Sequence, residues 1–537
     1  MQSTGAAASS YSSNELGSTG MSSSAQLLAL IFGSASPTVQ RQWLQQPIAF
    51  APPAAVSAKP PSGSLCFSAG LGQSQGGPCA VLAAVQAFTL RRLLFEPDRS
   101  RRQQVEAGGW SEEGSLTSLT PSAEEAESAL AAALADVLWQ AASSPAAASV
   151  TPRGVAVIAL PSVGEDAGML ERPLGEVLAQ LTVGAVEAHS WEATLATTTA
   201  RLPGLGFGCA ALGFLCSALL SRGLDVVASE RDDGSAPLLD PTFGHCAQEA
   251  LALMICGNAV ANVFDGERDL GGGLVLRGIT ARPPVGLLSE LEALRYIEVG
   301  SRLKGPASPL WVVASQTHYS LLFGLSTSVS AASPLAAVEE MLLARFSEFD
   351  RDEQGFIAAD RLRELLSSLG DEFGELPSED ELRKQMDPDG LSLITWDAFQ
   401  RHLKPRHPAA IQAAAAAAAA ARMAEAAGGE AAQAAREVAA AAVGASAAEE
   451  AARAAAQLEA SHAAAAAAAA SGGALTLYHY NGLATRGHEH KRVLSELKVT
   501  PGAARGMPVD SRGIAAVVRT RWHDASVEWE GQEPSIS

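Results

Sequence analysis

The sequence predicts an α+β fold in which helices and short strands alternate over residues 23–335. A glycine pair and Pro78 lead into an apolar run with helical spacing, which predicts a helix with Val81, Val85 and Phe88 on its apolar side. Ser122 and Glu125 form a capping-box pattern at the start of a second helix, and β-rich runs such as 155–160 follow. We interpret residues 23–335 as the main globular body.

Residues 336–404 alternate predicted helices with two acidic loops, a rhythm typical of paired EF-hands. In the first loop, position 12 is Arg361, where a bidentate Glu normally closes the calcium site. In the second loop, Ala398 occupies the same position and supplies no ligand. We therefore expect a degenerate EF-hand-like helical region that binds no calcium at signalling concentrations.

Residues 405–473 form an Ala-rich tract with scattered charges, a composition that favours a helical or disordered insertion without chemistry. Aromatic residues and strand-like alternation return at 475–483, 514–522 and 527–531. A free tail would have little reason to expose those aromatics. We therefore expect residues 474–537 to complete the core, with the Ala-rich tract inserted into a single domain.

Charge and composition exclude several classes of protein. Lys and Arg number 38 against 58 Asp and Glu, and a net charge of -20 argues against nucleic-acid or anionic-membrane binding. Residues 1–22 predict a disordered tail with no signal or transit-peptide pattern. The uncharged run 202–221 approaches membrane-spanning length, but its proline and glycines favour a buried core helix after a loop. The six cysteines show no C-x-x-C pair, so we expect free thiols in a soluble, cytosolic or nuclear protein.

Cys79 is the first candidate for chemistry. It follows the turn made by Gly76, Gly77 and Pro78 and lies at the start of the predicted helix. Unpaired backbone N–H groups and the helix dipole favour a thiolate there, and the thiolate is the nucleophilic form of cysteine. The alternative is a buried cysteine that packs as a small hydrophobic residue.

A cysteine nucleophile needs a base, and His318 is the best-placed histidine. It lies where the strand-like run 310–314 has ended and the next such run begins. The alternative is a hydrogen-bonded core histidine. His245 and Cys246 form a rival pair, but adjacent residues on a strand point to opposite faces, so their geometry is poor.

A thiol protease also needs donors aimed at the oxyanion that develops on the substrate carbonyl. Gln73 and Gln75 precede the turn. Gln73 lies six residues before Cys79, the spacing that papain-like proteases use for their oxyanion glutamine, and Gln75 is the nearer alternative. Taken alone, either residue also fits a plain surface amide.

These residues lie in segments that resemble one known family. The segment GQSQGGPCAVLAAVQAF resembles the catalytic cysteine segment of the MINDY deubiquitinases. The resemblance continues through PLLDPTFGHCAQEALALMICGNAVANVFDGERDL, ALRYIEVGSRLK, SPLWVVASQTHYSLLFG, the EF-hand-like region and LYHYNGL. It covers roughly residues 28–345, most of 346–400, and 475–537, and is nearest the third MINDY type. The Ala-rich tract and the longer Ser-rich N-terminus depart from the family's pattern.

The resemblance implies an atypical papain-like cysteine protease fold that hydrolyses isopeptide bonds in polyubiquitin, with a preference for lysine-48-linked chains. Carried over by position, it makes Cys79 the nucleophile, His318 the catalytic histidine and Gln73 the oxyanion glutamine. The expected partners are polyubiquitin chains and ubiquitinated proteins, without a cofactor, metal, nucleic acid or membrane, and the protein is expected to be a monomer. The remaining polar residues of the second quoted segment are interpreted as turns and caps: Asp240, Asn258, Asn262, Asp265 and Gly266.

Two other hypotheses remain open. A catalytically silent ubiquitin-chain binder would keep the fold and the acidic surface but would need none of the three site residues. An EF-hand calcium-responsive scaffold is the other, and Arg361 and Ala398 argue against it.

Overall fold

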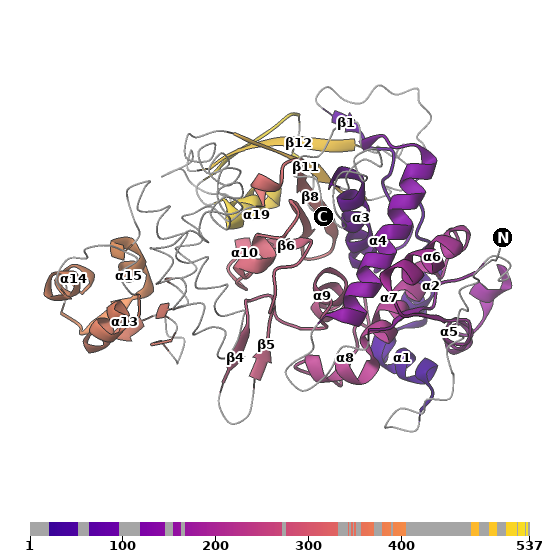
Figure 1. Cartoon of the computed structure of the whole chain (residues 1–537), viewed down its shortest axis with the longest axis horizontal. Coiled ribbons are helices and arrows are strands. Elements are labelled where there is room, and N and C mark those ends of the chain that lie inside the picture. Colours follow the sequence, from indigo (N-terminus) through magenta and orange to yellow (C-terminus); the bar gives the residue numbers. More distant parts are fainter. Residues whose placement is uncertain are drawn as a thin grey trace, which may run out of the picture. The chain divides into compact units, whose positions relative to one another are not determined.

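The structure is a computed structural model that describes residues 21–51, 64–95, 119–144, 154–162, 167–270, 275–330, 342, 345–346, 348–350, 356–369, 379–387, 390–403, 474–482, 493–501, 512–522, 525–531 and 533–534 (Figure 1). The Ala-rich tract at 405–473 and the first 20 residues of the expected tail lie outside this set. The chain divides into two compact units. One combines residues 1–330 with 472–537, and the other is residues 331–471.

A mixed sheet in the first unit joins a strand from the N-terminal part of the chain to strands from the C-terminal part (Figure 1). Within the described residues it has seven strands in the order β1, β12, β11, β8, β7, β6, with β13 paired to β12. These strands are β1 (Ser64–Cys66), β6 (Gly286–Ser289), β7 (Leu310–Ala314), β8 (Tyr319–Gly324), β11 (Leu475–Tyr480), β12 (Val493–Thr500) and β13 (Ser526–Trp529). Only the β6–β7 pair is parallel among these described pairings. Because β11 lies between β8 and β12, the C-terminal strands belong to the same sheet as β7 and β8.

Helices pack around this sheet, and α3 lies at the centre of the packing. The helices are α1 (Ser23–Phe32), α2 (Pro37–Leu44), α3 (Cys79–Phe95), α4 (Ala123–Ser143), α5 (Leu174–Val183), α6 (Trp191–Arg201), α7 (Ala210–Arg222), α8 (Leu224–Glu230), α9 (Gln248–Cys256), α10 (Glu290–Ala293), α11 (Ser301–Lys304) and α19 (Gly513–Arg521). The helix predicted after Pro78 is confirmed as α3. It contacts α4, which lies beside it in Figure 1, and also β7 and β8. Every residue from Cys79 to Leu90 is buried, because neighbours surround the helix instead of covering one face.

Other local predictions in this unit are confirmed. Ser122 Oγ accepts from the Glu125 N–H at 3.2 Å, and the Glu125 carboxylate accepts from the Ser122 N–H at 2.8 Å, which completes the capping box of α4. The β-rich run 155–160 contains β2 (Ala156–Ile158), which pairs with β3 (Val186–Ala188). Two further short strands, β4 (Glu267–Asp269) and β5 (Val275–Arg277), form a separate hairpin.

The apolar run after Arg201 forms the predicted core helix. It contains α7, all of whose residues are buried, and a short 3-10 turn at Leu202–Gly204 precedes it. Among the described helices, none is individually long and apolar enough to cross a membrane. The α7–α8 pair reaches that length and composition together, but it bends by 84°.

One C-terminal element differs from its prediction. The strand-like prediction for 514–522 is wrong, because residues 513–521 form helix α19. Ile514, Val517 and Val518 are spaced three and four residues apart and are fully buried, and α19 packs against α10 and β6. This helical spacing of buried residues outweighs the β preference of the paired valines. The flanking runs do form strands, β11 and β13.

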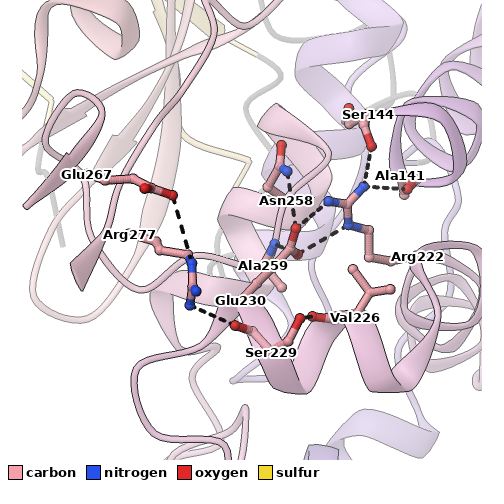
Figure 2. A network of polar contacts seen from close by, with 10 residues as sticks. All are labelled: Ala141, Ser144, Arg222, Val226, Ser229, Glu230, Asn258, Ala259, Glu267 and Arg277. Carbon is pink, nitrogen blue, oxygen red and sulfur yellow. Dashed lines mark hydrogen bonds and ion pairs between the residues drawn. The ribbon is translucent and has the colours of Figure 1, made fainter. Parts of the chain in front are cut away.

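A buried ion pair between Arg222 and Glu230 contacts the ends of helices α4, α7, α8 and α9 (Figure 2). Arg222, at the end of α7, pairs with Glu230, at the end of α8, and the two side chains are 2% and 3% exposed. Arg222 also donates to the Ser144 carbonyl oxygen at 2.6 Å, just after α4. The Glu230 carboxylate accepts from the Ala259 N–H at 2.8 Å and from Asn258 Nδ2 at 3.2 Å, both just after α9. Because both charges also have hydrogen-bond partners, these contacts offset the cost of removing the pair from water and hold the helix ends in place.

The polar residues interpreted as turns and caps make such contacts. Asp240 Oδ1 accepts from the Thr242 N–H at 2.9 Å, within a turn. Asp265 Oδ2 accepts from the Ser301 N–H at 2.7 Å, at the start of α11. Gly266 has a φ of 76°, which a residue with a side chain rarely adopts. These positions therefore shape the chain between α8 and α11.

The second unit has its own small core. Strands β9 (Phe356–Ala358) and β10 (Leu393–Thr395) pair antiparallel, with Ile357 opposite Ile394. Helices α13 (Leu362–Ser368), α14 (Glu379–Met386) and α15 (Trp396–Leu403) supply most of the buried apolar residues packed with this pair. The acidic loop residues 351–355 and 388–389 lie outside the described residues, so the calcium expectation stays a prediction.

Candidate active site

A close approach of two backbones fixes the turn before α3. Gly77 has a φ of 99°. A Cβ at this position would lie 2.8 Å from the Gly244 carbonyl oxygen, which also accepts from Trp43 Nε1 at 3.0 Å. The turn therefore requires glycine at residue 77. It places Cys79 at the first position of α3, as the sequence predicted.

Cys79 is a buried thiol in this structure. The residue is 2% exposed, and its Sγ donates to the Gly77 carbonyl oxygen at 3.6 Å. Burial raises the pKa of the thiol to about 11, against the opposing effect of the backbone N–H groups of Tyr319 and Ala80. The predicted thiolate is therefore wrong for this structure, because desolvation outweighs the helix N-terminus. The thiol needs a base before it can act as a nucleophile.

His318 lies immediately before β8. Its Nε2 is 3.0 Å from the carbonyl oxygen of Asn481. A carbonyl oxygen only accepts hydrogen bonds, so Nε2 carries the proton and Nδ1 is the unprotonated nitrogen of the neutral ring. Burial lowers the pKa of His318, hydrogen bonds with Asn481 oppose this effect, and His245 nearby lowers it further. A neutral imidazole with an unprotonated Nδ1 is the form that a general base requires.

Cys79, His318 and Gln73 line one pocket. The structure therefore brings together the three residues that sequence reasoning singled out. Further lining residues come from β8, at 319–321, and from the end of β11, at 480–482. The polar groups of this pocket include a thiol, an imidazole and carboxamides, a set that suits acyl transfer through a cysteine.

Gln73 and Gln75 lie differently with respect to this pocket. Gln73 Nε2 donates one hydrogen bond to the Gln75 carbonyl oxygen at 2.7 Å. A carboxamide has two N–H donors and this bond uses one of them, while the residue itself lines the pocket. Gln75 is not among the residues that line this pocket. Of the two glutamines, Gln73 is therefore the one that lies at the pocket with Cys79 and His318.

Asn481 is the site residue that sequence reasoning missed. It directly follows β11, which pairs antiparallel with β8 so that Tyr480 lies opposite Leu321. This register places Asn481 beside His318, although 163 residues separate them in the chain. The only local signal was the strand-like run LYHYNGL, which ends in a polar turn but does not reveal its partner strand.

Two other residues of β11 fix this strand beside the pocket. His479 is buried with its Nε2 2.9 Å from Ser320 Oγ, and burial lowers its pKa to about 3, which keeps the ring neutral. The Tyr480 hydroxyl donates to the Leu71 carbonyl oxygen at 2.9 Å. The strand is therefore bonded both to β8 and to the segment that leads to Gln73.

The rival pair of His245 and Cys246 lies near the pocket but does not line it. Cys246 is buried and forms an isolated bridge with Leu239. Burial raises the pKa of Cys246 well above its ordinary value, and the neighbouring Cys79 raises it further. His245 stacks on the ring of Phe243, with 6.2 Å between centroids. The geometry agrees with preferring Cys79 and His318 over this pair.

The described residues contain no group of three or more His, Cys, Asp and Glu side chains placed to hold a metal ion. The five cysteines with described side chains are free thiols, as expected: Cys79, Cys209, Cys216, Cys246 and Cys256.

Comparison with known proteins identifies the family. The domain described as "Deubiquitinating enzyme MINDY-3/4, conserved domain" matches residues 29–338. Ubiquitin carboxyl-terminal hydrolase MINDY-3 of Bos taurus is 31% identical over 359 residues, covering 62% of this chain and 74% of that protein. The Homo sapiens MINDY-3 is 30% identical over 367 residues, with the same coverage of 62% and 74%.

A second type of relative matches over a smaller share of its length. The probable ubiquitin carboxyl-terminal hydrolase MINDY-4 of Homo sapiens is 32% identical over 306 residues, covering 56% of this chain and 36% of that protein. No solved structure matches the chain significantly.

The domain match spans more than half of the chain and includes Cys79, Gln73 and His318. The chain therefore belongs to the MINDY-3/4 family of deubiquitinating enzymes.

Proposed function

We propose that this protein is a cysteine-type ubiquitinyl hydrolase that cleaves isopeptide bonds in polyubiquitin, with Cys79 as nucleophile, His318 as base and Gln73 as oxyanion donor. The observation that carries the proposal is that these three residues line one pocket. The hydrogen bond from His318 Nε2 to Asn481 supports it, because it leaves Nδ1 unprotonated.

In the proposed reaction, His318 Nδ1 takes the proton from Cys79 Sγ as the sulfur attacks the carbonyl carbon of the ubiquitin C-terminal glycine. The Gln73 carboxamide and nearby backbone N–H groups stabilise the tetrahedral oxyanion. His318 then returns the proton to the departing lysine amine. A water molecule, deprotonated by the same histidine, attacks the thioester carbonyl, and the C–S bond breaks to release ubiquitin with a free C-terminal carboxylate. The proton then passes from His318 to Cys79 Sγ, which restores the starting state. The Asn481 carbonyl stabilises the imidazolium that forms between these steps.

We also propose an atypical papain-like arrangement. Papain-like proteases combine cysteine, histidine and asparagine in their sites, and here the described bond to His318 is made by the backbone oxygen of Asn481. Here Cys79 begins a central helix, His318 precedes a strand of the antiparallel part of the sheet, and Asn481 follows the neighbouring strand.

The described free thiols suit a cytosolic or nuclear enzyme, since those compartments keep cysteines reduced.

The linkage preference is a separate part of the proposal and rests on family resemblance. We expect lysine-48-linked chains to be cleaved at least about 10-fold faster than other linkages, a difference of about 1.4 kcal/mol in transition-state binding. Ubiquitin chains of defined linkage and length, incubated with the protein and separated by electrophoresis, would measure this. Equal cleavage of all linkages would contradict the preference. Binding without cleavage, in a folded protein with intact Cys79, would favour the catalytically silent chain binder.

For the second unit we propose a paired EF-hand-like module that binds no calcium. The pairing of Ile357 with Ile394 supports it, because these are the eighth residues of loops starting at Asp350 and Asp387. At position 12 of the first loop, Arg361 pairs with Glu364 at 2.8 Å and is more than half exposed. Isothermal titration of the full chain with calcium should give no micromolar isotherm. A well-formed one would support the calcium-responsive scaffold instead.

A further inference from the structure

Gln46 is a fully buried glutamine outside the pocket, just after α2. Its Oε1 accepts from the N–H groups of Ser74 and Gln75, both at 3.0 Å. Its Nε2 donates to the Gly72 carbonyl oxygen at 3.2 Å. One side chain therefore binds backbone groups on both sides of Gln73, the residue proposed to hold the oxyanion.

Gln46 is itself held on a rigid part of the fold. Its Nε2 makes a second bond, to the Pro47 carbonyl oxygen at 2.8 Å. Its own carbonyl oxygen accepts from the Ala211 N–H at 3.2 Å, in the first turn of α7. Ile48 then donates to the Leu205 carbonyl oxygen at 2.9 Å. The amide thus links the Gln73 segment to the start of α7.

The hydrogen bonds of the buried Gln46 carboxamide strongly constrain the loop at residues 72–75. A carboxamide withdrawn from water must satisfy its donors and its acceptor, and hydrogen bonds in such dry surroundings hold their geometry closely. Both Nε2 donors and the Oε1 acceptor of Gln46 are used. Among the described contacts, Gln46 Oε1 is the side-chain acceptor for the N–H groups of both Ser74 and Gln75, and it also accepts from Ser74 Oγ at 3.3 Å.

We propose that Gln46 is a positioning residue: it fixes residues 72–75 so that the Gln73 carboxamide faces Cys79 in the pocket. This inference rests on the proposed function, in which Gln73 stabilises the oxyanion. Gln46 does not line the pocket, so it acts through Gln73 and not on substrate. A catalytic group displaced by about 1 Å can cost about 100-fold in rate. Loss of the Gln46 contacts should therefore lower kcat.

The test compares Gln46→Met with Gln73→Ala and with the double variant, using ubiquitin that carries a C-terminal fluorogenic amide. Methionine fills a similar volume without accepting from the two N–H groups. We expect Gln46→Met to lower kcat by about 10- to 100-fold with little change in KM, since losing a whole oxyanion donor costs about 100- to 1000-fold. In the Gln73→Ala background the same substitution should cost less than about 2-fold, because residues that act as one unit are not additive.

A second readout separates positioning from folding. A ubiquitin probe with a C-terminal alkyne alkylates the thiol without forming a carbonyl oxyanion, so Gln46→Met should label Cys79 at nearly the unaltered rate. Gln40→Ala is the matched control on α2, because the described hydrogen bond of the Gln40 side chain runs to the Ala35 carbonyl oxygen at 3.0 Å, away from the pocket segment, so both rates should be unchanged. Gln46→Glu is the second variant: burial favours the protonated acid, which keeps an acceptor oxygen for Ser74 and Gln75 and one O–H donor for a carbonyl oxygen, so it should retain more of kcat than Gln46→Met.

The results of these experiments distinguish a positioning role of Gln46 from a purely structural one. If the effect of Gln46→Met persists in the Gln73→Ala background, or if labelling falls as far as hydrolysis, Gln46 is structural and the proposal fails. It fails also if kcat is unaffected, or if neither Gln46 variant folds by thermal melting. If instead Gln73→Ala leaves kcat unchanged in an enzyme that Cys79→Ala inactivates, the proposed role of Gln73 is wrong, which is a separate result.

Discussion

Replacing Cys79 with Ala, or His318 with Ala, is expected to lower ubiquitin-chain hydrolysis by about 10,000-fold or more while leaving the protein folded. Loss of either the nucleophile or its base removes nearly the whole covalent route. The burial of Cys79 makes the base indispensable, because a thiol with a pKa of about 11 supplies almost no thiolate at neutral pH on its own. Time courses with lysine-48-linked chains would measure the loss.

Cys246→Ala is the matched control for this pair of variants. It removes another buried thiol close to Cys79 that does not line the pocket, so hydrolysis should stay within about 3-fold of the unaltered protein once folding is verified. Substantial hydrolysis by folded Cys79→Ala protein would contradict the cysteine mechanism. If His318→Ala alone remained active, a different base would have to be sought, with His245 the first candidate.

Ending the chain after residue 471 is expected to abolish activity and to cause aggregation. The truncation removes β11, β12, α19 and β13, which leaves the edge of β8 unpaired and exposes the apolar residues that these elements cover. It also removes Asn481, the hydrogen-bond partner of His318. Solubility, thermal unfolding and chain cleavage of the truncated protein would measure these effects.

The contrasting variant replaces residues 409–471 with a short Gly/Ser linker and keeps the C-terminal strands. We expect it to stay soluble and to cleave chains, since loop-closure entropy depends only weakly on loop length. A truncated protein that is as active and stable as the full chain would show that residues 474–537 form a separate module. An inactive linker variant that still folds would assign a role in catalysis to the Ala-rich tract.

Local sequence signals predicted the helices well. Pro78 and the glycine pair marked the start of α3, and the capping box of Ser122 and Glu125 marked the start of α4, because both signals act within one helical turn. The helix α19 was missed because its two valines favour strands locally, whereas the burial of Ile514, Val517 and Val518 against α10 and β6 favours a helix.

Long-range contacts account for what the sequence could not predict about the site. The bond from His318 to Asn481 depends on pairing between β8 and β11, and no local pattern specifies which strands pair across 163 residues. The neutral state of Cys79 depends on burial by elements from distant parts of the chain. Gln46 likewise gains its place only when the segments 46–51 and 70–75 meet.

The most direct test of the cysteine mechanism is to identify which cysteine reacts with ubiquitin that carries a C-terminal electrophile. The labelled protein would be digested and the modified peptide identified by mass spectrometry. The cysteine mechanism predicts one adduct, on Cys79, that forms far more slowly in His318→Ala and leaves the other five cysteines unmodified. An adduct on Cys246 or another cysteine, or no adduct in a protein that cleaves chains, would contradict it.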